Sequence, residues 1–264
     1  MKCSMRLEGF WKKNKKALVS YMMVGYPDYE TSLEAFRVLL REGTDILEIG
    51  FPFSDPVADG PTIQTAHEVA LRNGIRSKHV FELSLRLREE FSEKPFLLMT
   101  YYNPIFRIGL ENFCRRAKDS GIDGFIVPDL PPEEGIELKG VCEKLGLSVV
   151  FLASPTSTEG RLRLICESSD HMVYFVSLTG TTGAREELPI QRLRESLKLY
   201  RSVCKKPVVV GFGISKPQQA KEVASLADGV VVGSHFVRLA GERSLKELSK
   251  HVKGIKNALE DVKY

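Results

Sequence analysis

The sequence predicts a (β/α)8 barrel, also called a TIM barrel, that spans residues 1–264 as a single domain with an additional N-terminal helix. Eight short runs rich in Val, Ile, Leu and Phe recur along the chain, amphipathic stretches separate them, and no Pro-, Ser- or Gly-rich linker interrupts the series. A barrel of this kind needs eight strand–helix units in about 250 residues. An open, doubly wound sheet is the alternative, and the even spacing of the units favours the barrel.

The predicted strands are mostly continuous apolar runs rather than alternating ones. Continuous runs are typical of strands that are covered on both faces, as in a parallel sheet. The eight strands are expected at 17–24, 45–50, 95–101, 124–128, 147–153, 172–177, 207–212 and 228–234.

Amphipathic stretches predict the helices between these strands. The stretch 32–43 repeats apolar residues at helical spacing and stops at Gly43, and the stretches 109–121 and 132–146 also stop at a glycine. A glycine just past a helix supplies the left-handed residue that turns the chain into the next strand. Residues 9–16 are expected to end an N-terminal helix that closes the bottom of the barrel. Further helices are expected at 158–169, 189–203, 217–227 and 244–262.

The overall composition indicates a globular protein with a sizeable core. Of the 264 residues, 43% are hydrophobic and 27% are charged, and the net charge is +4. The dense basic run 11–16 indicates a solvated helix end rather than a nucleic-acid-binding arm. The sequence shows neither a membrane-spanning apolar run nor a secretion signal. We therefore expect a cytoplasmic protein that binds neither nucleic acid nor membranes.

The cysteines and histidines show no pattern that predicts a metal site. The odd number of cysteines, without a signal peptide, predicts reduced thiols. The five histidines lack metal-ligand spacing, so we expect no metal. The cysteines are Cys3, Cys114, Cys142, Cys166 and Cys204.

Glu48 interrupts the apolar strand 45–50. Because side chains alternate along a strand, Glu48 points away from both Leu47 and Ile49, and in a barrel one of these two faces is the interior. A partly desolvated carboxylate in the barrel mouth would have a raised pKa, suited to proton transfer near neutrality. The structural alternative is a glutamate that pairs with a basic side chain inside the barrel.

Two aspartates lie in the long loop 51–61 after the second strand. Asp59 precedes Gly-Pro-Thr and Asp55 precedes a proline, so a helix cap and an Asx turn are the structural alternatives to a functional role. The loops 102–109 and 178–189 are also long. Long loops at the C-terminal ends of barrel strands form the functional face.

Glycine-rich turns follow the last three strands. They contain Gly180 and Gly183, then Gly213, then Gly233. Glycine lets backbone N–H groups approach an anion, and the loops after strands seven and eight are the recurrent phosphate site of such barrels. We therefore predict a phosphate site here, with plain tight turns as the alternative.

Aromatic side chains are expected between the phosphate site and the carboxylates. They come from four of the predicted strands. This combination predicts an aromatic, phosphorylated substrate that is transformed by proton transfer. The aromatic residues are Tyr21, Tyr101, Tyr174 and Phe212.

The stretch 47–64, LEIGFPFSDPVADGPTIQ, closely resembles the signature of the tryptophan synthase alpha chain family. The resemblance covers essentially the whole chain. It continues in register through MTYYNPIFRIGLENF, GIDGFIVPDLPPEE, VYFVSLTGTTGA, GFGIS and DGVVVGS. The long first motif carries the assignment, because a segment such as GFGIS occurs in many phosphate-binding barrels.

The resemblance implies cleavage of indole-3-glycerol phosphate to indole and glyceraldehyde 3-phosphate, a retro-aldol reaction with no cofactor in this chain. It implies that Glu48 and Asp59 are catalytic, with Glu48 as a proton shuttle and Asp59 beside the indole N–H. It assigns Tyr174 a place near the glutamate and Thr182 a place in a mobile loop that closes over the aspartate. The phosphate-binding positions that it implies are Gly183, Phe212, Gly213, Gly233 and Ser234.

The resemblance also implies a partner, the tryptophan synthase beta chain, in an α2β2 heterotetramer. That partner uses pyridoxal phosphate to join indole with serine, and indole passes between the subunits. The positions that match the partner-facing surface are Asp55, Pro56, Asn103 and Pro104.

Two other functions are compatible with parts of the pattern. Another phosphate-binding barrel, such as an isomerase or a prenyl-glyceryl phosphate synthase, would explain the glycine turns but not the motif around Glu48. A subunit that only activates its partner would not need both carboxylates, and both Glu48 and Asp59 are present.

Overall fold

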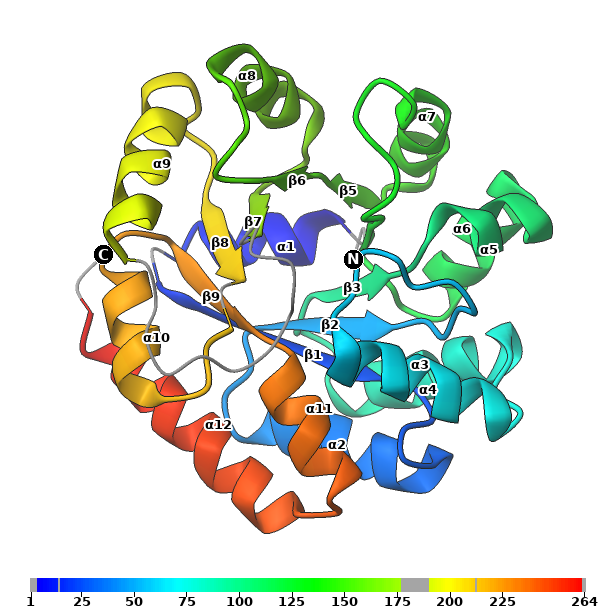
Figure 1. Cartoon of the computed structure of the whole chain (residues 1–264). Coiled ribbons are helices and arrows are strands. Elements are labelled where there is room, and N and C mark those ends of the chain that lie inside the picture. The colour runs from blue at the N-terminus through cyan, green and yellow to red at the C-terminus, as the bar shows by residue number, and fades with distance from the viewer. Residues whose placement is uncertain (1–3, 14, 177–189, 212, 263–264) are drawn as a thin grey trace.

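The computed structural model describes residues 4–13, 15–176, 190–211 and 213–262. Their strands are all parallel and form one sheet in the order β5-β4-β3-β2-β1-β9-β8-β7-β6 (Figure 1). The bounds are β1 Ala17–Met23, β2 Ile46–Gly50, β3 Phe96–Met99, β4 Gly124–Ile126, β5 Ser148–Val150, β6 Leu152–Ala153, β7 Val173–Val176, β8 Val208–Gly211 and β9 Gly229–Val232.

The sheet closes at Phe151. The predicted strand 147–153 is divided there into β5, which pairs with β4, and β6, which pairs with β7. The backbone N–H of Phe151 donates to Oγ of Ser169 at 2.9 Å, and its carbonyl accepts from the N–H of Tyr174 at 3.2 Å. The predicted barrel is confirmed, and the count of strands rises from eight to nine because one strand changes partner midway.

Helices surround the barrel, as Figure 1 shows. The predicted glycine stops are confirmed, since Gly43, Gly121 and Gly146 have φ values of 124°, 83° and 72°. The helices among the described residues are α1 Ser4–Trp11, α2 Tyr29–Arg41, α3 Pro61–Arg72, α4 Ser77–Glu90, α5 Tyr102–Ile108, α6 Leu110–Asp119, α7 Ile136–Leu145, α8 Glu159–Ser168, α9 Ile190–Val203, α10 Pro217–Ala224, α11 Ser234–Gly241 and α12 Leu245–Glu260.

One predicted loop is a helix. Residues 102–109 were expected to be irregular, but they form α5, whose first N–H donates to the side chain of Asp129 at 2.9 Å. Two further helices, α4 and α11, are absent from the sequence prediction. With seven residues, α5 is too short for hydrophobic periodicity to reveal. The side chain that caps α5 is Asp129, which lies in the loop after β4.

The hydrophobic core has two layers, one inside the barrel and one between the sheet and the helices. Leu7, Phe10 and Trp11 of α1 pack into the inner layer against the first residues of β1 and β2, Ala17 and Ile46. The strands begin at that end. The prediction that an N-terminal helix closes the bottom of the barrel is therefore confirmed.

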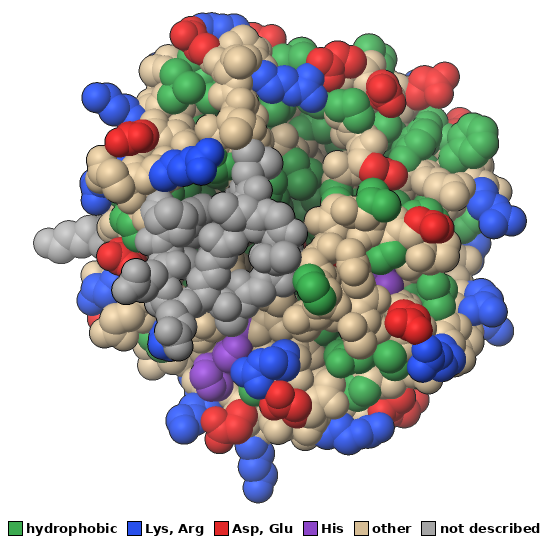
Figure 2. Space-filling view, in the orientation of Figure 1, with side chains coloured by type: hydrophobic (Ala, Val, Ile, Leu, Met, Phe, Trp, Pro, Cys, Tyr) green, Lys and Arg blue, Asp and Glu red, His purple; other side chains and the backbone are tan. Residues whose placement is uncertain are grey.

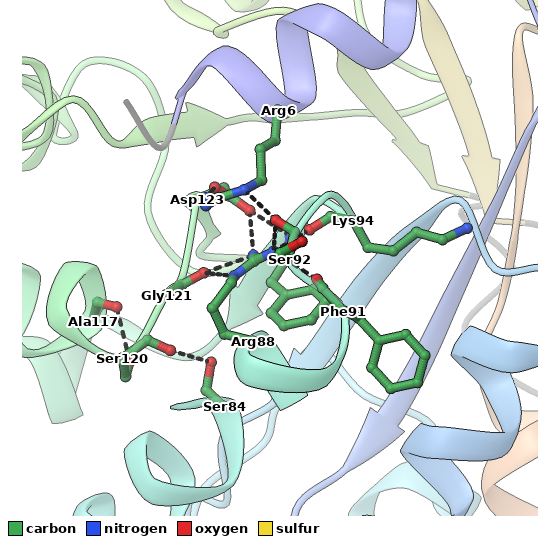
Figure 3. Close-up of polar contacts among 11 residues, drawn as sticks. Arg6, Ser84, Arg88, Phe91, Ser92, Lys94, Ala117, Ser120, Gly121 and Asp123 are labelled. Atoms are coloured by element: carbon green, nitrogen blue, oxygen red, sulfur yellow. Dashed lines mark hydrogen bonds and ion pairs between the residues drawn. The ribbon is translucent and has the colours of Figure 1, made fainter. Parts of the chain in front are cut away.

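A buried ion cluster fixes α1 to the bottom of the barrel (Figure 3). Asp123 is fully buried and pairs with Arg6 of α1 at 2.7 Å and with Arg88 of α4 at 2.8 Å. The same carboxylate accepts from the N–H of Phe96, at the start of β3. One aspartate thus joins two helices and a strand. Arg88 also donates to the carbonyls of Phe91, Ser92, Lys94 and Gly121.

Replacing Asp123 with asparagine is expected to lower the free energy of unfolding by about 3–5 kcal/mol, because two largely buried guanidinium groups lose their carboxylate. Urea denaturation measures the change. Glu68→Gln is the control, since it breaks the exposed Arg72–Glu68 pair and should cost less than about 1 kcal/mol. Equal effects of the two substitutions would contradict the structural role of the cluster.

The prediction of reduced thiols is wrong for two of the cysteines. Cys166, in α8, and Cys204, just after α9, form a disulfide with Cα atoms 5.8 Å apart. They are 38 residues apart in sequence and meet only because α8 and α9 are neighbours around the barrel. Cys114 and Cys142 are free and buried, with sulfur atoms 4.0 Å apart, and Cys3 lies outside the described residues.

Candidate active site

Glu48 lies in the middle of β2, opposite Tyr21 of β1, and is completely buried. Neither of its carboxylate oxygens has a hydrogen-bond partner among the residues that the structure describes. The structural alternative, a glutamate paired with a basic side chain, therefore finds no support there. An unpartnered buried carboxyl group costs folding free energy, so its presence points to a use in function.

Burial determines the protonation of Glu48. Loss of water around the group raises its pKa to about 8, and the nearby charge of Asp59 adds to the shift. Both causes disfavour the carboxylate. At neutral pH the group is therefore a carboxylic acid, able to give a proton to a bound substrate.

Asp59 is not a helix cap. The cap of α3 is Gly60, and the Asp59 carboxylate instead accepts a hydrogen bond from the hydroxyl of Tyr101 at 2.7 Å. The Tyr101 hydroxyl also accepts from the N–H of Ala58 at 3.0 Å, and Gln64 donates to the Asp59 carbonyl at 2.8 Å. These contacts hold the end of the loop after β2 against Tyr101, which lies between β3 and α5.

Three predicted tyrosines share the site with the carboxylates. Burial raises the pKa of Tyr21 and Tyr174, and the charges of Glu48 and Asp59 raise both further. Burial and the charge of Asp59 likewise raise the pKa of Tyr101. All three hydroxyl groups are therefore neutral at physiological pH, and that of Tyr101 donates to Asp59.

Glycines make room for two of these rings. A side chain on Gly50 would come within 2.4 Å of the Tyr21 hydroxyl, and one on Gly211 within 3.0 Å of the Tyr174 hydroxyl. Gly233 lies beside Tyr21 on the other side, with 3.5 Å from an added Cβ to the Tyr21 Cβ. Tyr21 thus lies between the Glu48 strand and the glycine turn after β9.

The predicted phosphate site is partly described. Gly233 is the N-terminal cap of α11 and Ser234 its first residue, with no side chain capping the helix end. Gly213 follows β8 in a left-handed conformation, with φ of 70°. The open N-terminus of α11 provides backbone N–H groups and a favourable dipole for an anion. Three further predicted residues, Thr182, Gly183 and Phe212, and the loop 178–189 lie outside the described residues.

The predicted partner-facing residues lie on the rim around the site. Asp55 and Asn103 are exposed, and Pro56 and Pro104 are half-buried. Asp55 does not form the expected Asx turn, because its backbone carbonyl, not its side chain, accepts the N–H of Val57.

His67, a buried histidine in α3, also contacts Asp59, and no sequence pattern singled it out. It lies 3.2 Å from the Asp59 carboxylate and accepts a hydrogen bond from the N–H of Phe53 at 3.0 Å. His67 follows Asp59 by eight residues, a spacing that allows the two side chains to meet. The same spacing is equally compatible with a histidine that only packs in the core. Only the path of loop 51–60 brings the two side chains together.

The described residues contain neither a candidate metal cluster nor a helix that could span a membrane. No cluster of three or more His, Cys, Asp or Glu side chains within it could hold a metal ion. No helix in those ranges is long and apolar enough to cross a membrane.

The arrangement can protonate a bound ligand and stabilise positive charge on it. Glu48 supplies a neutral acid buried inside the barrel, and Asp59 supplies a nearby carboxylate held by Tyr101. Two carboxyl groups in different surroundings can take different roles at one pH. Next to Tyr21, the glycine turn and the N-terminus of α11 present backbone N–H groups that are able to bind an anion.

Known proteins with similar sequences and structures agree on one family. Residues 7–263 match the family model of the tryptophan synthase alpha chain. The alpha chain of Aquifex aeolicus is 65% identical over 250 residues, with 95% of each chain covered. The alpha chain of Methanosarcina barkeri is 46% identical over 264 residues, with 97% of this chain and 98% of that one covered.

The solved structures agree with the sequence relatives. A structure from Aquifex aeolicus superposes with a TM-score of 0.90 at 60% identity, covering 98% of both chains. A tryptophan synthase structure from Mycobacterium tuberculosis superposes with a TM-score of 0.89 at 35% identity, and the match covers 98% of both chains. The chain therefore belongs to the tryptophan synthase alpha chain family, and it is a lyase of tryptophan biosynthesis.

Proposed function

We propose that this lyase cleaves indole-3-glycerol phosphate to indole and glyceraldehyde 3-phosphate, with Glu48 and Asp59 as its catalytic residues. One observation carries the assignment of residues. Glu48 is a fully buried carboxyl group with no partner among the described residues, and its pKa is raised to about 8. Such a group is suited to proton transfer, and folding gains nothing from it.

The proposed reaction begins with Glu48 as an acid. Glu48 gives its proton to C3 of the indole ring, and the positive charge that results spreads to the ring nitrogen. The Glu48 carboxylate then takes the proton of the C3′ hydroxyl, the C3–C3′ bond breaks, and its electrons neutralise the ring. Indole and an aldehyde leave, and Glu48 has recovered its proton.

Asp59 stabilises the intermediate in this scheme. Its carboxylate accepts a hydrogen bond from the ring N–H while that nitrogen carries positive charge. Tyr21, Tyr101 and Tyr174 line the ring-binding region in this scheme. Their burial supports this, as do the proximity of Tyr21 and Tyr174 to both carboxylates and that of Tyr101 to Asp59. We further propose that Thr182 closes over Asp59, as the family resemblance implies.

The substrate phosphate is proposed to bind at the glycine turns. Gly233, Ser234 and the open N-terminus of α11 support this assignment, together with the left-handed turn at Gly213. Gly183 and Phe212 complete the proposed set on the strength of the family resemblance.

Membership of the family implies a beta-chain partner. We propose an α2β2 heterotetramer in the cytoplasm, in which pyridoxal phosphate is held by the beta chain and this chain acts without a cofactor of its own. Residues 1–264 are proposed to fold as one domain, since a single sheet contains all the strands described.

The rim of the barrel provides the proposed partner surface. Val57 follows β2, Phe106 lies in α5 after β3, and Ile136 begins α7 after β4; they are 81%, 72% and 72% exposed. They share the end of the barrel where the predicted contacts Asp55, Pro56, Asn103 and Pro104 lie. Figure 2 shows hydrophobic side chains over α5. Large exposed apolar side chains on one rim are typical of an interaction surface.

Phe106→Asp is expected to weaken binding of the beta chain by at least about tenfold, because it places a charge in an apolar contact. Isothermal titration calorimetry with a beta chain measures the Kd, and thermal denaturation checks the fold. Leu199→Asp is the matched control, because Leu199 is also a large apolar side chain at the surface, 39% exposed, but lies on α9. Unchanged affinity of the Phe106 variant would exclude α5 from the interface.

Release of indole from indole-3-glycerol phosphate tests the proposed function directly. The full chain is assayed alone and with a beta chain, with indole and the aldehyde product measured together. We expect equal amounts of both products. No release, even with the partner present, would refute the proposed reaction and direct attention to other phosphorylated ligands.

A further inference from the structure

His67 joins the two ends of the loop that carries Asp59. It lies on α3, is 3% exposed, and engages both of its ring nitrogens. Nδ1 accepts a hydrogen bond from the backbone N–H of Phe53 at 3.0 Å, and Nε2 lies 3.2 Å from Oδ2 of Asp59. One buried side chain thus contacts residues near the beginning and near the end of loop 51–60.

The contact with Phe53 determines where the imidazole proton lies. Because Nδ1 accepts a hydrogen bond there, it cannot carry a proton, so the neutral ring carries its proton on Nε2. Nε2 therefore donates to Asp59. A backbone amide that donates to one ring nitrogen in this way sets the tautomer of the imidazole and the direction in which its other nitrogen points.

Two donors converge on the same oxygen of Asp59. The hydroxyl of Tyr101 donates to Oδ2 at 2.7 Å, and Nε2 of His67 donates to it at 3.2 Å. Across the ranges that the structure describes, Oδ1 accepts no hydrogen bond. The two donors thus fix one oxygen and leave the other to a ligand.

We propose that His67 is a positioning residue that, with Tyr101, holds Oδ2 of Asp59 so that Oδ1 accepts the indole N–H. This inference rests on the proposed role of Asp59 in the cleavage of indole-3-glycerol phosphate. The Asp59–indole contact strengthens as the ring gains positive charge, so correct orientation of the carboxylate acts on the transition state more than on the bound substrate. His67 therefore acts on kcat.

Two substitutions separate the contact with Asp59 from the contact with the loop. In His67→Asn the amide oxygen takes the place of Nδ1 and can still accept from Phe53, but the side chain is too short to reach Asp59. In His67→Gln the amide nitrogen takes the place of Nε2 and can still donate to Asp59, while the contact with Phe53 is lost. The pair thus distinguishes positioning of the carboxylate from support of the loop.

We expect His67→Asn to lower kcat roughly 10- to 100-fold with KM changed by less than about threefold. His67→Gln should retain kcat within about threefold of wild type. Steady-state release of indole measures both. Equal loss in the two variants, or no loss in either, would overturn the inference, as would a rise in KM at constant kcat.

A double-mutant cycle covers the case in which a variant is also less stable. If His67 acts through Asp59, His67→Asn causes no further loss of kcat in the Asp59→Ala background. A purely structural role predicts the same fold loss in both backgrounds, and that result would refute positioning.

The assay of wild type separates this inference from the function on which it rests. No release of indole by wild type would refute the proposed function. Release by wild type that is unaffected by His67→Asn would refute only the role of His67.

Discussion

Glu48→Gln is expected to reduce kcat for indole release by about 10³–10⁴-fold, because glutamine cannot give or take the proton that the proposed reaction needs. The two side chains have the same shape, so the substitution tests chemistry rather than packing. Indole release with saturating substrate and a saturating beta chain measures the loss. Residual activity within about tenfold of wild type would remove Glu48 from the mechanism.

Two controls test whether the loss of activity comes from misfolding of the Glu48→Gln variant instead of from the missing proton transfer. The affinity of the Glu48→Gln variant for a beta chain should equal that of wild type, because the buried Glu48 does not reach the rim where Phe106 lies. The pH profile of wild type is a second check. Since the pKa of Glu48 is raised to about 8 and the acid form starts the reaction, kcat/KM should fall as pH rises above that value.

Glu48→Gln is also expected to make the chain more stable at alkaline pH, by on the order of 5 kcal/mol. In wild type, the pKa of Glu48 is raised from 4.5 to about 8 on folding. Between these values the folded state keeps the proton and the unfolded state does not, so the free energy of unfolding of wild type falls as pH rises. Urea denaturation of both proteins between pH 5 and pH 9 measures the difference.

The pH dependence of this difference is the diagnostic quantity. It should be smallest at pH 5, close to the unfolded-state pKa of 4.5, and should level off above pH about 8, where neither state keeps the Glu48 proton. Glutamine leaves an unpaired polar group in the same place, but that cost is the same at every pH. A difference that does not change with pH would contradict a raised pKa at Glu48.

Asp59 provides an internal comparison for the same experiment. Its charge is the second cause of the raised pKa of Glu48, after burial. In an Asp59→Asn background, the increase in the free energy of unfolding that Glu48→Gln causes at alkaline pH should therefore become smaller without disappearing. A catalytic group such as Glu48 is expected to lower stability when the site keeps it buried and unpaired for its chemistry.

The barrel could be predicted because its signals are local. Each strand is a continuous apolar run, and glycines such as Gly43 and Gly146 end helices in the left-handed conformation that only a residue without a side chain adopts easily. The prediction was wrong where signals were short or absent. It placed a loop at α5, and it gave one strand where Phe151 divides β5 from β6.

The candidate site can be predicted from the sequence only as a set of residues, not as contacts. A carboxylate inside an apolar strand is enough to single out Glu48. The same sequence leaves Asp59 between a helix cap and a catalytic group, and the structure places the cap at Gly60 and the Asp59 carboxylate on Tyr101. The catalytic role of Asp59 is a proposal that the experiments above test.

Sequence alone predicts the fold class, the family and the carboxylate in β2, because strand hydrophobicity, glycine stops and the long motif 47–64 are properties of neighbouring residues. The folded chain was needed to show that Glu48 lacks a partner among the described residues, that Cys166 bonds to Cys204, and that His67 reaches Asp59. These three features depend on which elements lie side by side around the closed barrel. That arrangement brings together residues whose separation along the chain carries no information about their contact.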